Sequence, residues 1–185
     1  MSTTTSQLLT AEEFFALPDP QDGSKQELVR GKVITMPNPG FEHGEVQLAL
    51  GSLIRVFLLS NRIGRVVTES GAVTERKPDT VRGPDVSYYS KERLPLDQRV
   101  VGYHAEVPDL CVEIISPSNT KKEMRPKIKE YFFAGVRMVW VVDPEDRSVV
   151  VLRAPDEGRT LYDDAILDGG DVLPGFSCKV SDLFA

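Results

Sequence analysis

The segment Asp109-Leu-Cys-Val-Glu-Ile-Ile constrains this fold most, because it is almost entirely apolar over the length of a β-strand. A run of this kind predicts a central strand that is covered on both faces. Residues 136–143 form a second apolar run, and a helical pattern separates the two. A strand, a crossover helix and a second strand predict an α/β fold in which helices cover a mixed β-sheet.

The remaining segments predict further elements on either side of this core. Thr10 and Glu13 match a capping box ahead of a short helix, and Arg30-Gly31 predicts the turn of a hairpin. A long amphipathic helix is expected over residues 42–60. Further strands are expected at 65–69, 72–75, 84–89 and 148–153, near Thr160 and near Ala165, with a last turn at 181–185.

A helix is also expected between the two apolar runs, over residues 119–134. Thr120 and Glu123 have the spacing of a capping box at its start. Pro126 would fall beyond the first turn, where it removes a backbone donor and collides with the preceding turn. We therefore expect either a kink at Pro126 or a helix that starts later.

The length of 185 residues suits one globular domain, which we place at residues 9–185 after a flexible N-terminus at 1–8. Cys111 and Cys178 are the two cysteines, too few for a zinc motif or a disulfide framework, so a reducing, cytoplasmic location is expected. No stretch predicts a signal peptide or membrane span. The net charge of −6 disfavours passive coating of DNA, although an enzyme could neutralise phosphates locally with metal ions.

Two carboxylates are the first candidates for chemistry. Asp85 follows Pro84 at the start of a predicted strand, and Glu113 lies inside the apolar run. A glutamate in a buried strand is costly unless it is paired or binds a cation. Mg²⁺ often takes one or two carboxylates together with waters and substrate phosphates. Asp85 and Glu113 on neighbouring strands would supply such a site; alternatively, Glu113 lies at an exposed strand end or pairs with a lysine of the helix.

A local excess of basic residues follows the Glu113 strand. Between residues 120 and 137, six basic side chains minus two acidic ones give +4, in a protein of net charge −6. Such a run of charged residues usually lies on the solvent-exposed face of a helix. Its position beside the carboxylates also suits a lysine that stabilises charge on a phosphate. The basic residues are Lys121, Lys122, Arg125, Lys127, Lys129 and Arg137, and the acidic ones are Glu123 and Glu130.

Several motifs together resemble the Uma-two family, which is labelled endonuclease by resemblance and lies within the PD-(D/E)XK nuclease superfamily. The similarity runs over roughly residues 9–185. Each motif is weak alone, and their order makes the combination specific. They are Thr10-Ala-Glu-Glu-Phe, Glu27-Leu-Val-Arg-Gly-Lys, Glu42-His-Gly, Arg82-Gly-Pro-Asp-Val, Val112-Glu-Ile-Ile-Ser-Pro-Ser, Lys127-Ile-Lys-Glu-Tyr-Phe-Phe-Ala-Gly-Val, Trp140-Val-Val-Asp-Pro and Gly170-Asp-Val-Leu-Pro-Gly-Phe.

This resemblance implies a restriction-endonuclease-like core, a mixed sheet flanked by helices, with an N-terminal hairpin and a C-terminal β extension. It implies that Asp85 and Glu113 are metal ligands, to which the backbone carbonyl of Ile114 could be added. The superfamily's usual lysine would stand two residues after Glu113, where this sequence has Ile115. The family pattern instead assigns the lysine to Lys127 on the following helix.

Glu27 and His43 also match the family pattern as candidate catalytic residues. Glu27 could ligate a metal or hold a water, or it could only form an ion pair in the hairpin. His43 could contact a phosphate or take part in proton transfer. A histidine at the start of a helix can equally be a capping residue.

The sequence thus predicts a Mg²⁺-dependent endonuclease, with Mn²⁺ as an alternative ion, that hydrolyses phosphodiester bonds in DNA. A homodimer is expected, since paired sites can face the two strands of a duplex. Two alternatives stay open. One is a non-catalytic nucleic-acid-binding or protein-binding module that keeps the nuclease fold, and the other is a metal-dependent hydrolase of small phosphoesters.

Overall fold

The computed structural model describes residues 8–116 and 121–185, and in residues 121–123 the backbone alone. The N-terminus that we expected to be flexible lies outside the described residues apart from Leu8. Thr120 and the side chain of Glu123 also lie outside them, so the capping box expected there is not described.

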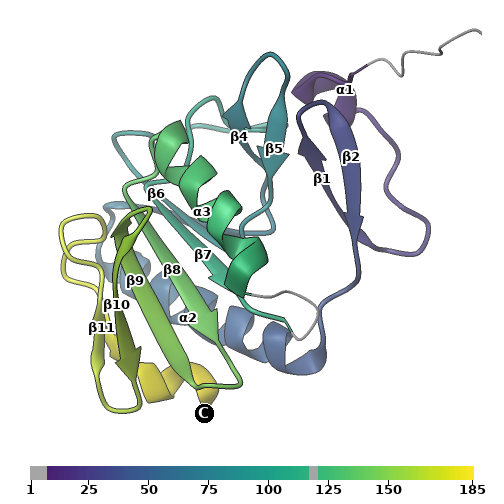
Figure 1. Cartoon of the computed structure of the whole chain (residues 1–185). Helices are drawn as coiled ribbons and strands as arrows, with labels where there is room; N and C mark the ends of the chain where they lie inside the picture. Colours follow the sequence, from purple (N-terminus) through teal and green to yellow (C-terminus); the bar gives the residue numbers. More distant parts are fainter. Residues whose placement is uncertain (1–7, 117–120) are drawn as a thin grey trace, which may run out of the picture.

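The main sheet has six strands in the order β10-β9-β8-β7-β6-β3 (Figure 1). The pair β7–β8 is parallel and the other four pairs are antiparallel, which confirms the predicted mixed sheet. The strands are β3 (Gly64–Thr68), β6 (Val86–Ser90), β7 (Leu110–Ile114), β8 (Met138–Asp143), β9 (Ser148–Ala154) and β10 (Glu157–Tyr162).

Helices α2 (Phe41–Ser60) and α3 (Lys121–Ala134) cover opposite faces of this sheet (Figure 1). Side chains alternate along β7: Leu110, Val112 and Ile114 pack in the core cluster that contains the buried stripe of α2. Cys111 belongs to the other cluster, which contains the buried residues of α3. Because Glu113 shares the parity of Cys111, its side chain faces α3.

A second, antiparallel sheet has the order β2-β1-β5-β4 and lies beside the N-terminal helix α1 (Ala11–Phe15). The capping box of Thr10 and Glu13 is confirmed. The hairpin turn is also confirmed at Arg30 and Gly31, both of which have the positive φ that a tight hairpin turn favours. The strands are β1 (Lys25–Val29), β2 (Lys32–Met36), β4 (Ala72–Glu75) and β5 (Thr80–Arg82).

The C-terminal segment forms the expected β extension. Its elements are β11 (Ile166–Asp168), β12 (Ser177–Lys179) and the 3₁₀ helix η1 (Val180–Phe184). Leu167, Leu173, Val180 and Leu183 of this segment are buried in the same core cluster as α2. The extension therefore closes the side of the sheet opposite α3.

Three expectations need correction. The strand that we expected to begin at Pro84 begins at Val86, so Asp85 directly precedes it. Helix α3 already includes Lys121 and holds Pro126 in its interior, so the later start is wrong. Strand β5 was not predicted, because three residues are too short for a periodic pattern. None of the described helices is long and apolar enough to cross a membrane.

Candidate active site

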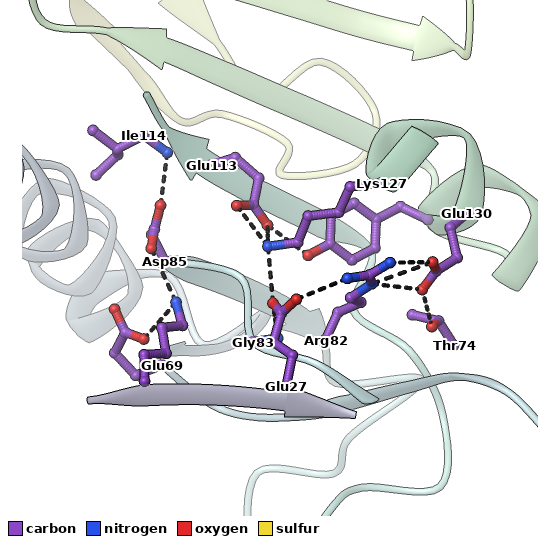
Figure 2. A network of polar contacts seen from close by, with 12 residues as sticks. Glu27, Glu69, Thr74, Arg82, Gly83, Asp85, Glu113, Ile114, Lys127 and Glu130 are labelled. Carbon is purple, nitrogen blue, oxygen red and sulfur yellow. Dashed lines mark hydrogen bonds and ion pairs between the residues drawn. The ribbon is translucent and has the colours of Figure 1, made fainter. Parts of the chain in front are cut away.

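Five elements converge on one small cavity, of about 60 Å³. Strand β7 ends there, β6 starts beside it, α2 begins there with its buried face inward, α3 crosses above, and β1 passes below (Figure 2). The ionisable residues that line the cavity are Lys25, His43, Glu69, Asp85, Glu113 and Lys127.

Asp85 is buried, and neighbouring groups contact both of its oxygens. Its Oδ2 accepts a hydrogen bond of 2.7 Å from the backbone N–H of Ile114 (Figure 2). Its Oδ1 lies 3.2 Å from Lys25 Nζ and 3.3 Å from His43 Nε2. The antiparallel register of β6 and β7 sets Val86 opposite Val112, which brings Asp85 to the end of β7.

Glu113 is 3% exposed and is held by two side chains of α3. Lys127 Nζ donates to its Oε2 at 2.9 Å, and the Tyr131 hydroxyl donates to its Oε1 at 2.5 Å. Lys127 and Tyr131 are four residues apart and therefore lie on one face of the helix. The expectation that Glu113 sits at an exposed strand end is wrong, and the alternative pairing with a helix lysine is present.

Glu27 completes a second contact to the same lysine. Lys127 Nζ lies 2.9 Å from Glu27 Oε1, so one ammonium group bridges Glu113 and Glu27 (Figure 2). Glu27 also accepts hydrogen bonds from Arg82 Nη1 at 2.9 Å and from the backbone N–H of Gly83 at 3.0 Å. Arg82 in turn pairs with Glu130 of α3. This chain of contacts ties the second sheet to α3.

His43, Glu69 and Asp85 form a further group on the side of the cavity away from Lys127. One potential ligand atom from each lies within 4.8 Å of the others. Both ring nitrogens of His43 are buried and have no hydrogen-bond partner among the described residues. The buried carboxylate of Asp85, the exposed carboxylate of Glu69 and the buried imidazole of His43 are a donor set that fits a divalent cation.

A family model named Uma2 and described as "Putative restriction endonuclease" matches residues 11–181. The chain belongs to the Uma2 family. The resemblance inferred from the motifs is therefore confirmed. None of the curated proteins matches the chain.

A solved structure agrees with membership of the Uma2 family. It is the crystal structure of a "putative nuclease belonging to DUF820" from Anabaena variabilis ATCC 29413. The two sequences are 26% identical, the match covers 95% of this chain and 97% of that one, and the TM-score is 0.80. The restriction-endonuclease-like fold is thus supported over almost the whole chain, and both descriptions support a nuclease.

The carboxyl groups of this Uma2 site differ in acidity. Burial alone would raise the pKa of Asp85, but His43, Lys25 and the Ile114 amide hold that pKa below the ordinary value. Burial raises the pKa of Glu113, and repulsion from Asp85 and Glu27 adds to this effect, against the attraction of Lys127. Burial would lower the pKa of Lys127, but Glu113 and Glu27 raise it overall. Lys127 therefore stays a cation at neutral pH.

We expect Asp85→Asn to flatten the acid side of the stability curve. The folded-state pKa of Asp85 lies below its ordinary value of 3.8. Its carboxylate therefore contributes stability that is fully present above pH 3.8 and is lost as the pH falls through the folded-state pKa. Urea unfolding at a series of acidic pH values should show a steeper loss in the wild type than in Asp85→Asn. Asp164→Asn, at a side chain that is 85% exposed, is the matched control; parallel curves for wild type and Asp85→Asn would contradict the prediction.

The five candidate catalytic residues all meet at this site. Asp85, Glu113, His43 and Lys127 line the cavity, and Glu27 reaches it through Lys127. Ile114 also lies at the cavity, but the contact described for it is made by its N–H to Asp85 and not by its carbonyl.

Three other basic residues of the run have described side chains, and none of these three lines the cavity. Arg125 and Lys129 pair with Asp156, and Arg137 pairs with Asp171 and lies 3.5 Å from the buried Asp109.

Four contributors were missed by sequence reasoning. Tyr131 could have been found, since it stands one helical turn after Lys127. Lys25 stands two residues before Glu27 and so shares its face of β1, which was a usable signal. Arg82 and Glu69 gave none, because their contacts depend on how the second sheet docks against α3 and α2.

Proposed function

We propose that this protein is a Mg²⁺-dependent endonuclease, able to use Mn²⁺, that hydrolyses phosphodiester bonds in DNA. The observation that carries the proposal is the position of Lys127 Nζ, 2.9 Å from both Glu113 and Glu27, at a cavity that Asp85 also lines. Two buried carboxylates and one buried ammonium at a shared cavity are suited to a phosphate and its counter-ion.

The metal ligands in this proposal are Asp85 and Glu113, with the carbonyl of Ile114 as a third. When bound, the ion would neutralise charge on the phosphate and acidify a water molecule. Asp85 is well suited because its lowered pKa keeps it ionised at neutral pH. Glu113 is fixed in direction by the hydroxyl of Tyr131.

Lys127 supplies the fixed positive charge next to the reacting phosphate. A cation already in place needs no reorganisation when negative charge develops in the transition state. Glu27 holds Lys127 from the side opposite Glu113, and Arg82 balances the charge of Glu27. His43 is close enough to Asp85 to contact a phosphate or move a proton there.

The wider setting is also part of the proposal. Residues 9–185 act as one domain, the substrate is DNA, and a homodimer presents two sites to the two strands. The described cysteines Cys111 and Cys178 are unpaired, which fits a cytoplasmic location.

A second candidate is a non-catalytic nucleic-acid-binding or protein-binding module that keeps the fold. One observation favours it: each buried carboxylate of the cavity already has a protein cation beside it, Lys25 for Asp85 and Lys127 for Glu113. These two buried carboxylates are therefore each compensated by a protein cation without any metal.

The test uses supercoiled plasmid and purified protein with Mg²⁺ or Mn²⁺. Nicking is expected in both ions, and it should disappear with EDTA and in a variant without the Asp85 carboxylate. Binding of DNA without nicking in either ion would favour the non-catalytic module. Nicking that persists without the Asp85 carboxylate would refute the proposed site.

A further inference from the structure

We infer that His43, Glu69 and Asp85 form a binding site for a divalent transition-metal ion, and that the Lys25 ammonium is its exchangeable counter-ion in the metal-free protein. This inference rests on the proposed metal dependence. The two sites share Asp85, but this one adds His43 and Glu69 and requires neither Glu113 nor Lys127.

His43 is buried and lines the cavity. Its side chain is 9% exposed, and neither ring nitrogen makes a hydrogen bond among residues 8–116 and 121–185, although Nε2 lies 3.3 Å from Asp85 Oδ1. Leaving such a group unsatisfied costs free energy, so a buried imidazole normally has a partner. The helical spacing 43, 46, 50, 54 sets His43 on the buried face of α2, which directs it at the cavity and not at solvent.

The three donor atoms lie close enough together to hold one ion. His43 Nε2 lies 3.3 Å from Asp85 Oδ1, close to the spacing of about 3 Å between adjacent ligands of an octahedral ion. Glu69 brings an oxygen within 4.8 Å of both. The Glu69 side chain is 41% exposed, which leaves the site open to an ion from solvent.

Lys25 shows that this position already attracts a cation. Its Nζ lies 2.7 Å from Glu69 Oε2 and 3.2 Å from Asp85 Oδ1, so it bridges the two carboxylates. The carboxylates of Asp85 and Glu69 carry two negative charges and Lys25 carries one positive charge, so the net charge of this group is −1. A divalent ion between the same oxygens would balance it, and the flexible lysine stem would release its ammonium toward solvent.

The donor set selects the class of metal. Mg²⁺ prefers oxygen ligands only, whereas imidazole together with carboxylates suits Mn²⁺, Co²⁺ and Zn²⁺. The site is therefore expected to discriminate against Mg²⁺, unlike the carboxylate site proposed for catalysis.

The decisive readout is the imidazole of His43. The chain has two histidines, so protein without an affinity tag and labelled with ¹⁵N-histidine gives two sets of ring signals. Zn²⁺ should shift the ring signals of His43 and leave those of His104 in place, and an equal concentration of Mg²⁺ should give a smaller shift of the His43 signals. The variant His104→Gln assigns the signals. Unchanged His43 signals at saturating Zn²⁺ would overturn the inference.

Variants test the exchange with Lys25. By calorimetric titration with Zn²⁺, Lys25→Met should bind about tenfold more tightly than wild type, because the competing charge is gone. Glu69→Gln should bind at least about tenfold more weakly. Glu113→Gln should leave Zn²⁺ binding at His43 intact. An unchanged affinity in Lys25→Met, with its amide spectrum still that of the folded protein, would refute the role of Lys25.

These measurements contain no DNA, so they separate the inference from the proposed activity. A shift of the His43 signals without plasmid nicking in any metal would support this site and contradict the nuclease. Nicking with Mg²⁺ and no His43 shift with Zn²⁺ would support the nuclease and overturn this site.

Discussion

Lys127→Met should lower the rate of plasmid nicking by roughly 10²- to 10³-fold, the usual cost of removing one preorganised charge from a transition state. The substitution keeps the length of the side chain and removes the ammonium that bridges Glu113 and Glu27. The rate is measured at saturating Mg²⁺ so that the loss reports on the chemical step.

Lys129→Met is the matched control for this prediction. Lys129 stands on the same helix two residues later, is 42% exposed, and lies 3.6 Å from the surface residue Asp156. Its removal takes away the same charge without touching the cavity, so nicking should stay close to wild type. A Lys127→Met rate within about tenfold of wild type, in folded protein, would show that Lys127 has a structural role only.

Arg82→Met is expected to lower the free energy of unfolding by about 3–5 kcal/mol, the cost of removing one partner from a buried ion pair. The guanidinium is mostly buried and bridges Glu27 and Glu130 (Figure 2). Its loss would leave Glu27, which is 2% exposed, with Lys127 as its remaining ion-pair partner among the described residues. Urea unfolding monitored by circular dichroism measures the effect.

Arg125→Met provides the comparison for Arg82. Arg125 pairs with Asp156 at 2.7 Å, but both side chains are more than half exposed, so water compensates for the loss. We expect its unfolding curve to coincide with that of the wild type. If Arg82→Met also coincided with the wild type, the bridge between β5 and α3 would contribute nothing to stability.

The sequence correctly predicted the features that depend on residues close together in the chain. The capping box of Thr10 and Glu13, the turn at Arg30-Gly31 and the apolar stripe of α2 depend on residues within a few positions of one another. The same holds for the apolar run of β7, in which one glutamate could be singled out because each of its neighbours is hydrophobic.

Sequence reasoning was weaker where an element was short or a proline interrupted a pattern. Strand β5 has three residues, and it exists because β1 and β4 pair with it on either side. Pro126 was expected to delay or kink α3, yet the helix includes it five residues after Lys121. Packing of Met124, Ile128 and Tyr131 against the sheet stabilises the helix in spite of it.

By itself, the sequence determined the type of the main elements, the family and the five candidate catalytic residues. The tertiary structure decided how these residues are paired. It set Lys127 between Glu113 and Glu27, Lys25 between Asp85 and Glu69, and His43 beside Asp85 without a hydrogen-bond partner among the described residues. The physical reason is that a buried charge is stabilised by whatever lies within a few ångströms of it, and those neighbours come from segments that are up to 100 residues apart, as for Lys127 and Glu27.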